Sequence, residues 1–254
     1  MIDIHSHILF GLDDGAQTPE DTLSMARQAV SDGIRTIVAT PHHKDGTYTN
    51  PPERILARCQ EVQALVKEQG IDLTILPSME LRVNGSEVED LKQELILTYN
   101  QGQRYILLEL PRDHVPRYME SLVFNLQMQG IIPIIPHPER NKEISENINL
   151  LYRLVKQGAM AQLTAASVVG KFGKKIQRLS QDMIKHHMVH FIASDAHNTG
   201  SRGVILSEAY NELSKRFGAD YVDLYCEYAE KVVAGKDCEL IPVQKYKKKW
   251  FGIF

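Results

Sequence analysis

Short apolar runs rich in isoleucine, leucine and valine alternate along the chain with longer segments in which apolar residues recur every three or four positions. Short runs of this kind are typical of buried strands, and the longer period is typical of helices packed against them. Strands are therefore predicted at Ile2–Ile4, Thr36–Thr40, Leu73–Pro77, Tyr105–Leu110, Ile131–Ile135, Met160–Thr164 and Val189–Ala193.

The helices between these strands have recognisable first and last residues. Thr18, Pro19 and the two acids after them indicate an N-cap, a proline in the first turn and a negatively charged helix start, and Gly33 follows the last turn. Further helices are predicted from Pro52 to Gly70, up to Gly130, up to Gly158, at Gly203–Phe217 and at Ala219–Ala234.

Alternating strands and helices favour a parallel sheet with helices outside it. Seven strands could form a closed barrel or an open, doubly wound sheet. The sequence shows no linker, low-complexity segment or internal repeat, and 254 residues is an ordinary length for one α/β domain. We therefore expect a single domain, residues 1–254.

Histidines and carboxylates stand at the ends of the predicted strands. Every strand except Met160–Thr164 ends in or just before such residues, which are His5, His7, His42, Glu80, Glu109, His137, Asp195 and His197. In a β/α barrel the active site forms at the C-terminal ends of several strands at once. An open sheet would spread these ends along a line, so the pattern favours a barrel with a polynuclear metal site at its mouth.

Two motifs have a spacing that suits metal binding. His5 and His7, like Asp195 and His197, are two positions apart at a strand end, where alternate side chains share one face. A carboxylate such as that of Glu80 can bridge two ions about 3.5–4 Å apart. Nitrogen and oxygen ligands without thiolate suit Mn, Fe or Zn rather than Mg.

The motifs together resemble the polymerase and histidinol phosphatase (PHP) superfamily. Within it, the strings MIDIHSHIL, GLDDGA, ATPHH, HPERN and SDAHN are similar to bacterial PHP-type protein-tyrosine phosphatases, over essentially the whole chain. The resemblance implies a distorted (β/α)7 barrel and up to three divalent ions, most commonly manganese. It also implies action on phosphotyrosine in the tyrosine kinases that control capsule and exopolysaccharide synthesis, and in the substrates of those kinases.

The resemblance implies a ligand set as well, and it adds Asp14 to the residues at the strand ends. It assigns one ion to His5, His7, Glu80 and Asp195, a second to Glu80, Glu109 and His137, and a third to Asp14, His42 and His197. Many members of the superfamily have a histidine at the position of Glu109.

Some of these residues have plainer interpretations. Asp13 could take the role of Asp14, and Asp14 could instead be a turn residue before Gly15. Glu109 could be a buried acid paired with an arginine. The remaining histidines are interpreted as surface or structural residues, and three acids as a solvated helix start; they are His43, His114, His186, His187 and His190, and Glu87, Glu89 and Asp90.

Two arginines follow the strongest motifs. Arg140 lies three residues after His137, and Arg202 lies five residues after His197. A phosphate dianion requires a planar cationic group beside the metals, so both are predicted to bind phosphate rather than to be loop residues on the surface. Two other arginines, Arg82 and Arg112, are weaker candidates of the same kind.

The composition argues against several other functions. The net charge of −3 gives no reason to expect nucleic-acid binding. The three cysteines lack CxxC spacing, and none is followed six residues later by an arginine, which argues against a disulfide framework, a thiolate zinc site and a cysteine-phosphatase loop. We expect a cytoplasmic protein with no signal peptide and no transmembrane segment.

The basic and aromatic tail around 247–251 could contact an anionic membrane or a kinase partner, although such tails are more often frayed. Alternatives to a tyrosine phosphatase are a histidinol-phosphate or other small-metabolite phosphatase, a PHP-type phosphodiesterase and a non-catalytic metal-binding module.

Overall fold

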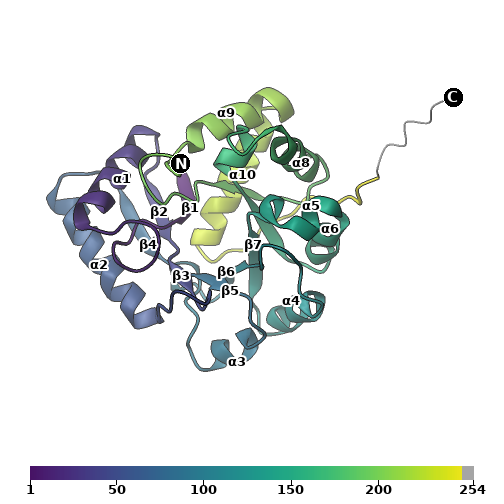
Figure 1. The fold of residues 1–254 in the computed structure, drawn as a ribbon, viewed down its shortest axis with the longest axis horizontal. Helices are drawn as coiled ribbons and strands as arrows, with labels where there is room; N and C mark the ends of the chain where they lie inside the picture. Colours follow the sequence, from purple (N-terminus) through teal and green to yellow (C-terminus); the bar gives the residue numbers. More distant parts are fainter. Residues whose placement is uncertain (248–254) are drawn as a thin grey trace.

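The computed structural model describes residues 1–247, with strands at the centre and helices around them (Figure 1). The strands are β1 (Ile2–Ser6), β2 (Thr36–Ala39), β3 (His42–His43), β4 (Thr74–Pro77), β5 (Glu80–Arg82), β6 (Tyr105–Glu109), β7 (Ile132–Pro136), β8 (Met160–Thr164) and β9 (Phe191–Ala193). Every pairing between these strands is parallel. The predicted parallel α/β fold is therefore confirmed.

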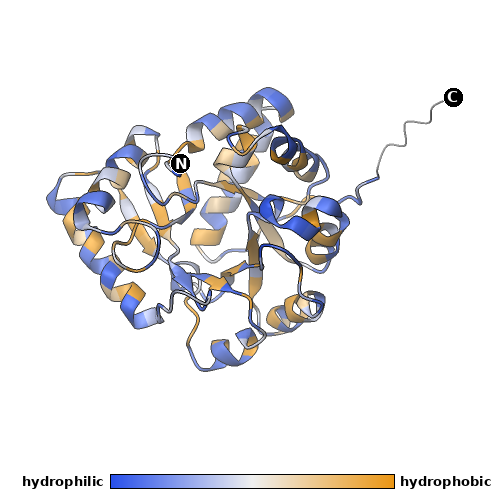
Figure 2. Cartoon of the chain, in the orientation of Figure 1, coloured by the Kyte–Doolittle hydropathy of each residue, from blue (hydrophilic) through white to orange (hydrophobic). Residues whose placement is uncertain are grey.

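The helices cover the outer faces of the strands. They are α1 (Pro19–Ser31), α2 (Pro52–Glu68), α3 (Glu87–Lys92), η1 (Tyr99–Gln101), α4 (Met119–Met128), η2 (Pro138–Arg140), α5 (Lys142–Glu146), α6 (Asn149–Lys156), α7 (Ala165–Val168), α8 (Lys174–Lys185), α9 (Leu206–Phe217) and α10 (Ala219–Val233). Figure 2 shows apolar residues gathered on the strands and polar residues on much of the outer helical surface. The cap predicted for α1 is confirmed, since the Thr18 hydroxyl accepts a hydrogen bond from Asp21 N at 3.2 Å.

The strands form two sheets, in the orders β1-β2-β4 and β3-β5-β6-β7-β8-β9. Hydrogen bonds continue the pairing across the breaks after β2 and β4, because Ser78 N donates to the Ala39 carbonyl at 2.9 Å and Glu80 N to the Pro41 carbonyl at 3.0 Å. After these breaks the short strands β3 and β5 begin at His42 and Glu80, which are two of the predicted ligands.

The first and last strands lie side by side. Asp195 N donates to the His5 carbonyl at 2.9 Å, and His7 N donates to the Ala196 carbonyl at 2.8 Å. These bonds hold the His-x-His and Asp-x-His motifs, which are about 190 positions apart in the sequence, next to each other.

Several predicted boundaries were wrong. The strand predicted at Val189–Ala193 begins at Phe191, and the helix predicted from Gly203 begins at Leu206. The patterns missed β3 and β5 because each has only two or three residues, and they missed α5, α7 and α8. No helix among residues 1–247 is both long and apolar enough to cross a membrane. Most of the basic and aromatic tail lies outside the described residues.

Candidate metal centre

The nine predicted ligands lie together at the C-terminal ends of the strands. Only Asp14 is well exposed, with 45 % of its side chain accessible, because it lies in the loop after β1. Three sets of side chains each bring ligand atoms within 4.8 Å of one another: His5, His7 and Glu80; His42, Glu80 and Glu109; and His7, Asp14, His42 and His197.

The deepest set surrounds the fully buried Glu80 carboxylate. The Nε2 atoms of His5 and His7 are 3.2 Å apart, and each lies 3.4 Å from Glu80 Oε2. Asp195 Oδ1 lies 3.6 Å from the first of these nitrogens and 3.5 Å from the second. Two imidazoles and two carboxylates thus point at one small volume.

Glu80 also faces a second set. Its Oε1 lies 2.9 Å from His137 Nε2, which is 3.8 Å from Glu109 Oε1. His42 Nδ1 lies 3.0 Å from Glu80 Oε2 and 3.9 Å from Glu109 Oε2. His42, which the resemblance assigns to the third ion alone, therefore also borders the second position.

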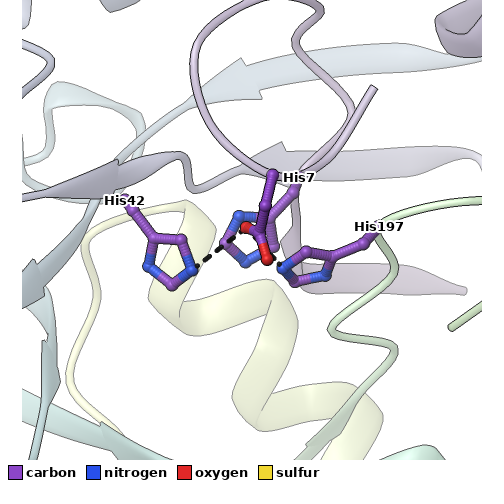
Figure 3. Close-up of side chains that lie close together, drawn as sticks. His7, His42 and His197 are labelled. Atoms are coloured by element: carbon purple, nitrogen blue, oxygen red, sulfur yellow. Dashed lines mark ion pairs between the residues drawn. The ribbon is translucent and has the colours of Figure 1, made fainter. Parts of the chain in front are cut away.

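The third set lies nearest the surface. Asp14 Oδ1 is 3.3 Å from His197 Nε2 and 3.5 Å from His42 Nε2. Figure 3 shows the ring of His7 between those of His42 and His197, with these two ion pairs as dashed lines. The rings of His7 and His197 are in direct contact, with centroids 3.7 Å apart.

Unsatisfied atoms at the centre fit bound cations. Among residues 1–247, His42 Nδ1, Glu80 Oε2, Glu109 Oε2 and His197 Nε2 are buried and make no hydrogen bond of suitable geometry. Leaving buried polar atoms unpaired is costly, so such atoms are rare without an unseen partner. Here they converge, and imidazole and carboxylate are the ligands that suit Mn, Fe or Zn.

The structure separates the roles of two adjacent aspartates. Both carboxylate oxygens of Asp13 are held by hydrogen bonds: its Oδ2 accepts one from His7 Nδ1 at 2.6 Å and one from His42 N at 3.0 Å, and its Oδ1 accepts one from Gly15 N at 2.9 Å. Asp13 is therefore the turn residue, and Asp14 is the one that faces His42 and His197. Gly15 is required here because a Cβ atom would lie 2.1 Å from the His7 carbonyl oxygen.

Hydrogen bonds from outside the cluster orient two of its imidazoles. Asp13 binds Nδ1 of His7, and the buried Gln162 Oε1 lies 2.8 Å from Nδ1 of His5. The Gln162 amide is held with Oε1 toward His5 because its Nε2 donates a hydrogen bond to the Leu163 carbonyl at 2.8 Å. Both imidazoles therefore carry their proton on Nδ1 and turn Nε2 toward the cluster, as metal-binding histidines usually do.

Sequence reasoning missed the role of Gln162. It lies on β8, the strand that offers no predicted ligand. A polar residue inside a buried parallel strand, as in the string MAQLT, was the available signal.

The four arginines near the centre differ in their partners. Arg140 Nη1 lies 2.5 Å from Asp195 Oδ2, and Arg202 Nη1 lies 3.2 Å from Asp14 Oδ2. Arg82 Nη2 lies 2.8 Å from Glu109 Oε2, so the interpretation of Glu109 as an acid paired with an arginine describes a real contact. The fourth arginine, Arg112, makes no ion pair among residues 1–247.

Four residues of the HPERN string make side-chain contacts with different partners. His137 faces Glu80, and Arg140 pairs with Asp195. Glu139 is buried and accepts hydrogen bonds from Thr164 N at 3.0 Å and Ser167 Oγ at 2.6 Å at the start of α7. Asn141 caps α5 through Ile144 N, and its Nδ2 donates to the carbonyls of Pro111 and His114.

The residues interpreted as surface or structural lie outside the three sets. His190 is buried at the start of β9, where it accepts a hydrogen bond from Ala161 N at 3.1 Å, and burial lowers its pKa to about 3. The interpretation of Glu87 and Asp90 as solvated was wrong. Glu87 is fully buried against Gly85 N, and Asp90 lies 2.7 Å from Lys44 Nζ.

The surroundings shift the pKa values of the ligands in both directions. Burial alone would raise the pKa of Glu80, but His5, His137 and His42 outweigh it and hold that pKa well below its ordinary value. Burial lowers the pKa of His197 to about 4, which keeps this imidazole neutral. Burial and the neighbouring Glu80 carboxylate raise the pKa of Glu109 to about 7. Neighbouring carboxylates also raise the pKa values of His5, His7 and His42 above the ordinary value, so a cation must displace protons from these groups as well.

Replacing Gln162 is expected to weaken metal binding. In Gln162→Leu the His5 ring loses its acceptor and can present the wrong nitrogen, which should cost roughly 10- to 100-fold in metal affinity. Gln162→Glu keeps an acceptor and should retain most of that affinity. Calorimetric metal titration measures both variants, with Gln63→Leu as a control because Gln63 bonds to Leu73 and Ile75 away from the centre. Wild-type affinity in Gln162→Leu would contradict this role.

Metal affinity should also depend on the protonation of Glu109. Because its pKa is raised from 4.5 to about 7, a cation must displace a proton from it below pH 7. We expect the contribution of Glu109 to metal affinity to fall about tenfold per pH unit below pH 7 and to be constant above pH 7. Metal titrations of the wild-type protein and of Glu109→Gln between pH 5.5 and 8 isolate this contribution as the difference between their affinities. If the two affinities depended on pH in the same way, the role of the Glu109 proton would be refuted.

Known proteins resemble this chain over most or all of its length. The family model described as capsular polysaccharide synthesis, CpsB/CapC, matches residues 1–234. The tyrosine-protein phosphatase YwqE of Bacillus subtilis is 44 % identical over 100 % of both chains. The putative tyrosine-protein phosphatase CapC of Staphylococcus aureus is 37 % identical, also over 100 % of both. The tyrosine-protein phosphatase CpsB of Streptococcus pneumoniae is 31 % identical over 92 % of this chain and 98 % of its own.

Two solved structures resemble this one to different degrees. A crystal structure from work on YwqE of Bacillus subtilis and CpsB of Streptococcus pneumoniae, described as unique metal-dependent tyrosine phosphatases, superposes with a TM-score of 0.95 at 43 % identity, over 98 % of this chain and 100 % of that one. The phosphotriesterase homology protein of Escherichia coli shares the fold alone, with a TM-score of 0.57 at 11 % identity, over 88 % of this chain and 94 % of that one. The chain therefore belongs to the CpsB/CapC family of capsular polysaccharide synthesis proteins.

Proposed function

We propose that this chain is a metal-dependent protein-tyrosine phosphatase that acts on phosphotyrosine in bacterial tyrosine kinases and their substrates, in capsule or exopolysaccharide regulation. The observation that carries the proposal is the convergence of nine histidine and carboxylate side chains, with unpaired buried atoms, in a chain 44 % identical to a tyrosine-protein phosphatase over its whole length. The cavity above these side chains has a volume of about 260 Å³ and is bordered by arginines.

The residues that would hold the ions are the nine described above. Ions bound there would supply the positive charge that activates a water molecule for in-line attack and neutralises the phosphate. Arg140 and Arg202 would bind the equatorial oxygens of the phosphoryl group, since a guanidinium can hold two oxygens at once. Tyrosinate is a tolerable leaving group because phenol has a pKa of about 10, and solvent can protonate it.

Several finer features belong to the same proposal. Manganese is the expected metal, with iron and zinc as alternatives for the same ligand types. The hydrogen bonds between β1 and β9 support closure of the strands into a distorted (β/α)7 barrel. We place the chain in the cytoplasm as a single domain, in keeping with its three free cysteines.

Activity is expected to depend on metal and not on thiols. Removing metal with EDTA should abolish hydrolysis of a phosphotyrosine peptide, and Mn²⁺ should restore it. Replacing all three cysteines by serine should leave the rate nearly intact, because Cys59 is buried and its pKa is raised to about 11. A phosphoserine peptide, histidinol phosphate and single-stranded DNA complete the substrate panel. Faster turnover of one of these, or an inactive cysteine-free variant, would overturn the proposal.

Both arginines are expected to act on phosphate. Lysine keeps the charge but not the planar fork, so Arg140→Lys and Arg202→Lys should each lose a contact of about 1.5–3 kcal/mol. That loss corresponds to roughly a 10- to 150-fold lower kcat/KM. Metal content should be unchanged, and Arg216→Lys on the outer surface of α9 serves as the control. Wild-type rates in both variants would show that phosphate binding does not use these arginines.

A further inference from the structure

A second cavity adjoins the one above the metal centre. Its volume is about 170 Å³, and it lies between the segment after β6 and the segment after β7. The two cavities share Glu109, Arg112, His137 and Arg140 on their borders. A group that leaves the metal centre in this direction enters the second cavity directly.

The walls of this cavity are partly apolar. Leu110, Pro111, Pro136 and Pro138 contribute to its lining. A cavity of about 150 Å³ can hold benzene, so the size suits one six-membered aromatic ring. In an aryl phosphate the ring is bonded to the bridging oxygen and must lie directly beside the phosphorus. The adjoining cavity therefore has the position and volume that the ring of a phosphotyrosine requires, with leucine and proline side chains on part of its wall and charged or polar side chains on the rest.

The two walls are fastened to each other before any ligand binds. Asn141 Nδ2 donates to the Pro111 carbonyl at 2.7 Å and to the His114 carbonyl at 2.9 Å. Lys142 N donates to the Arg112 carbonyl at 2.9 Å. A preformed cavity loses little conformational entropy on binding, which favours affinity for a rigid ring.

Arg112 stands at the boundary between the two cavities. Its side chain is exposed, and among residues 1–247 it has no carboxylate partner, whereas Arg82, Arg140 and Arg202 are each paired with one. A free guanidinium at this position can stack on the face of an aromatic ring.

We propose that the cavity between the segments after β6 and β7 is the binding site for the aromatic ring of the substrate, with Arg112 over the ring, and that it selects aryl over alkyl phosphate esters. The proposal rests on the phosphatase function proposed above and adds the place where the ring of the substrate binds and the residues that select it. A phosphoserine side chain has no ring and leaves this cavity empty.

Two non-hydrolysable inhibitors test the site. Benzylphosphonate carries a ring beside its phosphonate and methylphosphonate does not, so the ratio of their inhibition constants isolates the contribution of the ring. Burial of a phenyl group is worth tenfold or more in affinity, and we expect roughly that ratio in the metal-loaded wild-type protein. Arg112→Ala and Leu110→Ala should each reduce the ratio several-fold. In Leu110→Ala the inhibition constant of methylphosphonate should stay unchanged, whereas Arg112→Ala is judged by the ratio alone because Arg112 also borders the metal cavity.

The matched control is Arg117→Ala, because Arg117 is an exposed arginine a few residues farther along that borders neither cavity. It should keep the wild-type ratio. Tyr48→Ala tests the competing position, since Tyr48 borders the metal cavity near His42. The proposal would be overturned if benzylphosphonate and methylphosphonate inhibited the wild-type protein equally. It would also be overturned if Tyr48→Ala abolished the difference between the two inhibitors while Arg112→Ala and Leu110→Ala kept it. Failure of the phosphatase function itself would appear differently, as no inhibition by either compound and no hydrolysis of any phosphate ester.

Discussion

The burial of one carboxylate governs the arrangement of the centre. Glu80 is fully buried, and an isolated carboxylate in that position would be unstable. His5 on β1, His42 on β3 and His137 just after β7 surround it and keep its pKa low. The short strand β5 begins at Glu80, and nitrogen atoms of these three histidines and of His7 lie within 3.4 Å of its carboxylate oxygens.

Much of the site could be predicted from the sequence because its geometry follows from simple periodicities. The carboxyl ends of parallel strands meet at one end of the fold, and alternate residues share a face. Those two rules bring His5, His7, Asp195 and His197 together without knowledge of the fold's details. Asp14 came from the resemblance rather than from these rules, because it lies in a loop.

The rest depended on backbone conformations and partners that have no pattern in the sequence. His137 and Asp195 adopt left-handed conformations, with φ of 36° and 52°, which are uncommon outside glycine and which no periodicity predicts. The distinction between Asp13 and Asp14 required the close approach of Gly15 to His7. The string MAQLT marked Gln162 as an unusual polar residue in a buried strand, but its role is clear only when its contact with His5 Nδ1 is known.

The contacts of the HPERN string have a consequence for how such a protein can change over time. Four of its five side chains make contacts with different partners: His137 with Glu80, Arg140 with Asp195, Glu139 with the start of α7, and Asn141 with α5 and the segment after β6. Only the first two of these contacts reach the metal centre. A relative that had lost His137 and Arg140 could therefore still need Glu139 and Asn141 to hold its backbone in place.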